Sequence, residues 1–150
     1  MRLVIQRTQK SSVIINGKEL RTCAAGMMLL LGIEVADSEE DIDWLCPKIA
    51  KLRIFPDEAG VMNKDILETE GDVLLISQFT LHASTKKGNR PSYLQAARPE
   101  QAIPLYEKFI ARLERELGKK ITTGEFGADM QVELINDGPV TIIIDSKNKE

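Results

Sequence analysis

A short apolar run that follows a glycine constrains the fold of this chain more than any other feature. Gly26 precedes Met27 to Leu31, a run that would be apolar on both faces of a strand. Such a run is typical of a central strand that is covered on both sides. A second run, Val73 to Ile76, predicts another buried strand over Asp72 to Gln78. Neither run approaches the roughly 20 apolar residues of a membrane-spanning helix.

Further strands flank these two runs. Those expected from the sequence span 2–9, 12–16, Glu19 to Cys23, and roughly 130–136 and 139–145. The turn signal Asn16-Gly17 separates the second strand from the third. Residues 83–92 combine small, polar and basic residues with glycine and proline, and they predict a loop.

Two helices complete the expected elements. The first begins after Ser38, which can cap it, and its buried stripe repeats at helical spacing: Ile42, Leu45, Ile49 and Leu52. Pro47 predicts a kink or break near Asp43 to Cys46. The second helix spans about 99–117 and closes at Gly118.

Length and composition fit one folded domain over residues 1–150, since 43% of the 150 residues are hydrophobic and a core can form without disulfides. The fold class we expect is mixed α/β, with largely antiparallel β-sheets in a layered or barrel-like arrangement and two main helices packed on one side. The net charge of −3 argues against a whole-surface nucleic-acid binder but permits a local basic patch. Without a recognisable signal or membrane segment, and with Cys23 and Cys46 standing alone, we expect a cytoplasmic protein with no membrane partner.

The chain lacks the usual signatures of metal and triad chemistry. His82 is the only histidine, and a structural role is favoured for it. The sequence contains no Gly-x-Ser-x-Gly elbow, no P-loop and no Gly-x-Gly-x-x-Gly. We therefore expect no metal, no cofactor and no triad carried by the protein.

Three segments carry chemistry. Ser77-Gln78-Phe79-Thr80-Leu81 places hydrogen-bonding side chains at the end of a buried strand, where they either satisfy the backbone or line a pocket. Asn136-Asp137-Gly138-Pro139-Val140-Thr141 reads as a tight hairpin turn, or as a rigid cis-proline turn with fixed carbonyl oxygens. The basic loop, with Lys86, Lys87 and Arg90, is either solvated or contacts phosphate.

Ser77 to Leu81 and Asn136 to Thr141 resemble the two signature motifs of bacterial and eukaryotic D-aminoacyl-tRNA deacylases, and the resemblance extends along essentially the whole chain. It includes Val4 to Arg7, Lys51 to Phe55, Lys87 to Ser92, Gly124 to Met130 and Ile143 to Ser146. The loop has fewer arginines than many relatives, and His82 stands where an aromatic or aliphatic residue is more usual.

The resemblance implies a homodimer that hydrolyses the ester joining a D-amino acid to the terminal adenosine of tRNA and that also removes misplaced glycine. Each Gly138–Pro139 turn, in the cis form, would face Ser77, Gln78, Phe79 and Thr80 of the partner subunit and exclude the Cβ of an L-residue. Arg7 would hold that turn. Phe126 and Met130 would wall the pocket, Val140 and Thr141 would complete the selecting segment, and Lys86, Lys87 and Arg90 would contact tRNA. No DNA partner is expected.

An aminoacyl ester is already activated, so a positioned water or the substrate's own 2′-hydroxyl could attack it without a triad. Backbone amides near Phe79 and Thr80 could stabilise the oxyanion. Thr80 has no neighbouring base and is expected to orient substrate or water rather than to act as the nucleophile. Two other functions stay open: a related deacylase of mischarged L-aminoacyl-tRNA, and a non-catalytic tRNA-binding dimer.

Overall fold

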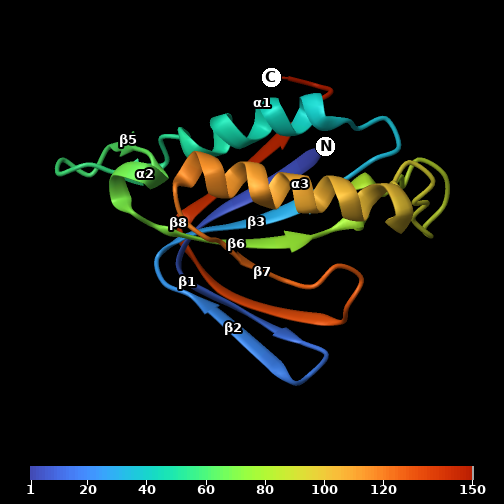
Figure 1. Ribbon diagram of the computed structural model, residues 1–150, viewed down its shortest axis with the longest axis horizontal. Helices are drawn as coiled ribbons and strands as arrows, with labels where there is room; N and C mark the ends of the chain where they lie inside the picture. Colours follow the sequence, from blue (N-terminus) through green and yellow to red (C-terminus); the bar gives the residue numbers. More distant parts are fainter. Residues whose placement is uncertain (150) are drawn as a thin grey trace.

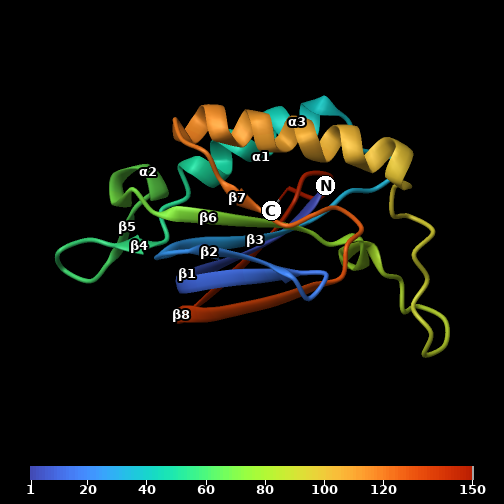
Figure 2. The ribbon, with the colours of Figure 1, turned by 60° about the horizontal axis from the view of Figure 1, so that its bottom comes forward.

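The computed structural model describes residues 1–149 and contains one large mixed sheet with two long helices on one face (Figures 1 and 2). The strands of this sheet are β1 (Arg2–Ile15), β2 (Glu19–Cys23), β3 (Gly26–Gly32), β6 (Asp72–Ser77), β7 (Thr122–Thr123) and β8 (Met130–Asp145). The remaining elements are α1 (Glu39–Ala50), β4 (Phe55–Pro56), β5 (Met62–Lys64), α2 (Ile66–Thr69), the 3-10 helix η1 (Phe79–His82) and α3 (Pro99–Leu117). The expected mixed α/β class, with both main helices on one side, is confirmed.

The sheet has the order β2-β1-β3-β6-β7, and β8 pairs with the free edge of β1. β1 is antiparallel to β2, β3 and β8, whereas β3, β6 and β7 run parallel to one another. The carboxyl ends of β3 and β6 therefore meet at one end of the sheet, where parallel strands commonly form binding crevices.

The two apolar runs form central strands that are buried on both faces. On the side covered by helices α1 and α3, β3 and β6 contribute Met27, Leu29, Leu31, Val73 and Leu75 to the main core. On the other side, Met28, Leu74 and Ile76 pack with Val13 and Ile15 in a second core. Alternate side chains of one strand thus enter two cores, which explains why the runs contain no polar residue.

The sheet curls toward a nearly closed barrel because β1 bends in its middle. Its first half, Arg2 to Thr8, pairs with β3, while Ser11 to Ile15 pair with β2. The bend brings β2 against the opposite edge of the sheet, where the Arg21 guanidinium donates to the carbonyl of Thr123 in β7 at 2.6 Å. This side chain joins two edges that lack backbone pairing to each other.

The prediction of a break in the first helix is wrong. α1 continues from Glu39 to Ala50 with Pro47 inside it. A proline within a helix costs about 3 kcal/mol. Ile42, Leu45 and Ile49 are buried beside Pro47, and each such side chain returns about 1.5–3 kcal/mol. Tertiary packing of the stripe therefore outweighs the local penalty.

Two further strand predictions need correction. The segments 2–9 and 12–16 form the single strand β1, and 130–136 and 139–145 form the single strand β8. Both halves of β8 run antiparallel to β1, so the segment between them is not a hairpin turn. The pairing shifts register around Thr8, which lets both long strands bend together without reversing.

Over the described residues, none of the helices combines the length and the apolar character needed to cross a membrane.

Candidate active site

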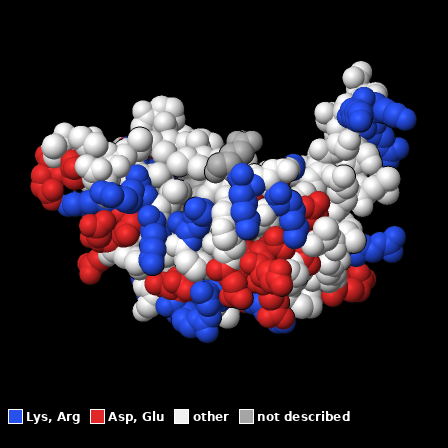
Figure 3. Space-filling view, turned by 90° about the horizontal axis from the view of Figure 1, so that it is seen from above, with Lys and Arg blue, Asp and Glu red and all other residues white. Residues whose placement is uncertain are grey.

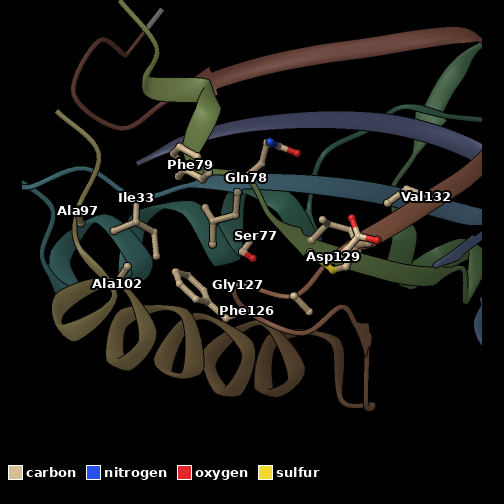
Figure 4. A pocket seen from close by; sticks show the side chains of 14 residues that line it. Ile33, Ser77, Gln78, Phe79, Ala97, Ala102, Phe126, Gly127, Asp129 and Val132 are labelled. Carbon is tan, nitrogen blue, oxygen red and sulfur yellow. The ribbon is translucent and has the colours of Figure 1, made fainter. Parts of the chain in front are cut away.

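A pocket of about 340 Å³ opens at the carboxyl ends of β3 and β6 (Figure 4). Its lining comes from the ends of both strands, the start of α3 and the segment between β7 and β8: Leu31, Ile33, Ile76, Ser77, Gln78, Phe79, Ala97, Ala102, Phe126, Gly127, Ala128, Asp129, Met130 and Val132. The structure thus brings together Ser77, Gln78 and Phe79 with Phe126 and Met130, residues that the family resemblance assigns to one site.

Aromatic pairs fix two walls of this pocket. Phe79 is about half exposed at the mouth, and its ring meets Tyr93 edge-on with centroids 5.0 Å apart. Phe126 packs against Tyr106 with centroids 5.8 Å apart. Burial raises the pKa of Tyr106, whose hydroxyl donates to the carbonyl of Leu75 at 3.2 Å. Each wall is therefore backed by a second aromatic ring, and the Phe126 wall rests on a tyrosine that is hydrogen-bonded to β6.

Ser77 and Gln78 point in different directions. Figure 4 shows the Ser77 hydroxyl facing the space above Phe126, whereas the Gln78 amide turns away from it. The Gln78 amide nitrogen donates to the Thr80 hydroxyl at 2.5 Å. Thr80 lies in η1, beside the pocket rather than among its lining residues. Gln78 therefore orients Thr80, and Ser77 is the hydroxyl that faces the pocket.

His82 lies at the end of η1 and is buried. Its Nδ1 atom is 4.0 Å from the Glu34 carboxylate, and its ring leaves no room for a side chain at Gly32. It does not line the pocket.

The second motif forms a corner of β8 with a cis Gly138–Pro139 bond. Gly138 has a φ of +118°, a conformation that residues with a Cβ rarely adopt. The Asn136 amide nitrogen donates to the carbonyls of Arg7 and Val140, at 3.0 and 2.9 Å. It thereby satisfies two backbone acceptors that the register shift leaves unpaired. Gly138 and Pro139 themselves are exposed.

Arg7 clamps this corner to the end of the helical layer. Its Nε atom is 2.9 Å from the Asp137 carboxylate, and its Nη1 atom donates to the carbonyl of Ile54 at 2.6 Å. A Cβ built on Gly138 would lie 3.1 Å from Arg7 Nη2 and 3.0 Å from Val140. The charge of the carboxylate and the planar guanidinium thus fix the corner from one side.

The corner and the pocket lie at opposite ends of the sheet. Arg7 pairs with Met27 at the start of β3, whereas Leu31 near its end lines the pocket. A strand of this length spans roughly 20 Å at about 3.3 Å per residue. Figure 1 shows β8 reaching its corner at the left, while β6 ends at the right. Within one chain, neither Gly138 nor Pro139 lines the pocket, and Val140 and Thr141 do not line it either.

The remaining predicted residues, Lys86, Lys87 and Arg90, lie exposed on the loop that follows η1. A bridge between Ser84 and Ser92 closes this loop near the pocket end. The structure contains no ion pair for the three cations among residues 1–149.

Sequence reasoning missed several residues that shape the site. Ala97, just before α3, and Ala102 within it line the pocket with small side chains, and small residues of this kind carry no signal of their own. Asp137 was part of the quoted motif, but its pairing with Arg7 depends on the fold. Asp129 supplies the pocket's carboxylate and stands beside the predicted Met130.

Comparison with known proteins decides the family. A family model described as "D-Tyr-tRNA(Tyr) deacylase" matches residues 4–145. The chain belongs to this family. A "D-aminoacyl-tRNA deacylase" of Bacteroides fragilis (strain YCH46) is 67% identical over the full length of both chains. One from Flavobacterium johnsoniae is 59% identical, also over both full lengths. These relatives are named as deacylases, which are hydrolases of ester bonds, and the chain is an enzyme of this class.

Solved structures agree with the architecture. A structure described as "c-Myc DNA Unwinding Element Binding Protein" has a TM-score of 0.90 and 36% identity, covering 97% of this chain and 98% of that one. A "probable eukaryotic D-amino acid tRNA deacylase" has a TM-score of 0.82 at 15% identity, covering 95% and 97%, and it supports the fold alone.

Proposed function

We propose that the chain removes D-amino acids, and mischarged glycine, from tRNA as a homodimer with two composite active sites. The pocket of one subunit would receive the Gly138–Pro139 corner of the other. The observation that carries this proposal is the separation of the two signature motifs: a concave pocket at one end of the sheet and an exposed, clamped corner at the other. If one corner enters the partner's pocket, two-fold symmetry requires that the other corner does the same. Translation supplies the substrate, so the enzyme works in the cytoplasm.

Hydrolysis in this site needs few catalytic groups because the ester is already activated. The Phe79 and Thr80 amides lie at the start of η1, where a helix leaves its first N–H groups without internal acceptors. In this proposal they stabilise the oxyanion, a contribution of about 2.7–4 kcal/mol for one donor. Water or the 2′-hydroxyl of the substrate attacks, and Thr80, oriented by Gln78, positions it. Thr80 has no adjacent base and is not the nucleophile.

Chirality is selected by exclusion rather than by affinity. A hydrophobic pocket discriminates between substrates that differ by one methylene by only about 10- to 200-fold. A rigid wall at the position of an L-residue's Cβ therefore gives better discrimination between the two enantiomers. The corner supplies that wall, Arg7 with Val140 and Thr141 supports it, and Phe126 and Met130 shape the side-chain space. Glycine lacks a Cβ and passes the same wall. Lys86, Lys87 and Arg90 would approach tRNA phosphates from the pocket's own subunit.

The first experiment measures hydrolysis of D-tyrosyl-tRNA, L-tyrosyl-tRNA and glycyl-tRNA by the purified protein. Rapid loss of the D-tyrosyl and glycyl esters, with the L-tyrosyl ester spared, is expected. Equal loss of the L ester would contradict the wall and favour the L-directed deacylase. No turnover of any ester would leave the non-catalytic tRNA-binding dimer. Duplex DNA added to the same reactions should compete only weakly, because it carries no aminoacyl ester to occupy the pocket.

A mixing experiment tests the composite site. Ser77→Phe fills the pocket, and Gly138→Ala disturbs the corner, so each variant alone should be inactive. Equal amounts exchanged into mixed dimers should recover about a quarter of wild-type activity, because half the dimers are mixed and each has one intact pocket–corner pair. A site built within one chain predicts no recovery.

A further inference from the structure

A groove at the end of α1 carries three exposed cations, and none of its lining residues among 1–149 is a carboxylate. The groove has a volume of about 480 Å³ and is lined by Trp44, Pro47, Lys48, Lys51, Leu52 and Arg53; we call it the α1 basic groove. The Lys48 and Lys149 ammonium groups lie 5.1 and 4.6 Å from the centre of the Trp44 ring. An aromatic face of this kind holds cations in place without neutralising them.

This groove is unusual in a chain whose net charge is −3. Several other surface cations face a carboxylate: Lys64 with Glu58, Lys108 with Glu39, Arg112 with Glu116, Lys119 with Asp72, Lys120 with Glu114 and Lys147 with Asp41. Across residues 1–149, Lys48 and Lys51 form no ion pair. Figure 3 shows basic side chains on the projecting loop at the right, while basic and acidic side chains are interspersed over the rest of this face.

The groove lies beside the Gly138–Pro139 corner of the same chain. Arg7 joins them, because it pairs with Asp137 in the corner and donates to the carbonyl of Ile54 just after the groove. Lys51 is three residues before Ile54, so their Cα atoms are at most about 11 Å apart. On the other side, Lys48 shares a second groove with Ile142 and Ile143 of β8, which follow the corner.

From this placement we infer that the α1 basic groove binds phosphates of the tRNA whose ester occupies the partner subunit's pocket. The inference rests on the proposed function: when the corner enters the partner's pocket, the groove comes to the rim of that pocket. The basic loop of the partner subunit would flank the same rim, so cations from both subunits would grip one acceptor arm. A polyanion fits this surface because each lysine that meets a phosphate releases a condensed counterion.

The test compares the double variant Lys48→Glu/Lys51→Glu with Lys108→Glu/Lys120→Glu, which changes the net charge equally but lies along α3 and just after it. Substrates are D-tyrosyl-tRNA and D-tyrosyl-adenosine, which lacks the tRNA phosphates. For the groove variant, KM for the tRNA ester should rise at least about tenfold, with kcat and D-tyrosyl-adenosine hydrolysis nearly unchanged. The slope of log(kcat/KM) against log salt should become shallower by about 1–2.

Mixed dimers assign the groove to one subunit. With Ser77→Phe on one subunit and Gly138→Ala on the other, the only working pocket receives the corner of the Ser77→Phe subunit. Groove substitutions on that subunit should raise KM, and the same substitutions on the Gly138→Ala subunit should not. Equal effects from either subunit, or wild-type KM for the groove variant, would overturn the inference. Failure of wild type to hydrolyse both esters would instead overturn the proposed function.

Discussion

The two ends of the sheet hold their functional residues in different ways. The pocket end collects side chains from four segments that are distant in sequence, from Leu31 to Val132. The corner end is nearly self-contained, since Asn136 to Val140 are fixed by their own hydrogen bonds and by Arg7. The first is concave, and the second is exposed and held by contacts within a short stretch of chain. A two-fold dimer with composite sites requires that each chain carry both a pocket and a corner that fits the partner's pocket.

The corner should be the less tolerant end. Gly138→Ala places a Cβ against Val140 and Arg7 at a φ of +118°, and it should lower D-tyrosyl-tRNA hydrolysis at least about 100-fold. Gly17→Ala is the matched control, because Gly17 also has a positive φ but no neighbour within 4 Å. Both variants should lose about 1–3 kcal/mol of stability, measured by urea unfolding. Comparable activity in the two variants would contradict a special role for the corner.

The same contrast explains what the sequence could and could not predict. The corner motif is contiguous, so its importance and its candidate cis bond could be proposed from residues 136–141 alone. Its geometry could not, because the hairpin expectation ignored that β1 is long enough to pair with both halves of β8. Met27 to Leu31 predicted a central strand correctly, because a strand that is buried on both faces appears in the sequence as an uninterrupted apolar run.

Only some of the residues that line the pocket could be identified from the sequence. Ser77 to Phe79 stand out because polar residues abruptly follow an apolar strand, whereas Ala97 and Ala102 contribute by being small. Pro47 shows the converse error, since a strong local signal was overridden by Ile42, Leu45 and Ile49 packing into the core. Features that depend on packing between segments distant in sequence cannot be predicted from the local sequence of either segment.

Loosening the clamp should have an intermediate effect on activity. Arg7→Lys keeps the charge but cannot contact Asp137 and the Ile54 carbonyl with one planar group, so the corner gains freedom. We expect about a tenfold loss of kcat/KM for D-tyrosyl-tRNA and a measurable gain in L-tyrosyl-tRNA hydrolysis. Arg112→Lys in α3, which loosens an ion pair with Glu116, should change neither rate. A loss of stability with unchanged D-to-L discrimination would reduce Arg7 to a structural residue.

At the pocket end, the Thr80 hydroxyl should matter less than the backbone around it. Thr80→Ala and Thr80→Val remove the acceptor of the Gln78 amide but leave the Phe79 and Thr80 N–H groups in place. One hydrogen bond contributes about 0.5–1.5 kcal/mol, so single-turnover rates should fall about 3- to 10-fold. Thr22→Val, on the exposed face of β2, serves as the control. Retention of most activity by both Thr80 variants would defeat the orienting role.

Asp41 lies at neither end of the sheet, and its carboxylate should contribute to stability but not to catalysis. Burial raises the pKa of Asp41, but hydrogen bonds from Lys147, Ser146 and the Ser38 N–H outweigh that effect and lower the pKa from 3.8 to about 2. A depressed folded-state pKa stabilises the protein above about pH 4, and this contribution is lost as the pH falls toward 2. The shift corresponds to about 2 kcal/mol at neutral pH.

Asp41→Asn should therefore lower the free energy of unfolding by about 2 kcal/mol at pH 7 and by much less near pH 2, measured by urea unfolding at both values. Glu40→Gln, one residue earlier and exposed, should change neither. Hydrolysis of D-tyrosyl-tRNA at 25 °C should stay at the wild-type rate, since the start of α1 contacts neither the pocket nor the corner. An equal loss of stability at both pH values would mean that Asp41 acts through packing rather than charge. A fall in activity would mean that the helical layer couples the two ends of the sheet, which the separate anchoring of pocket and corner argues against.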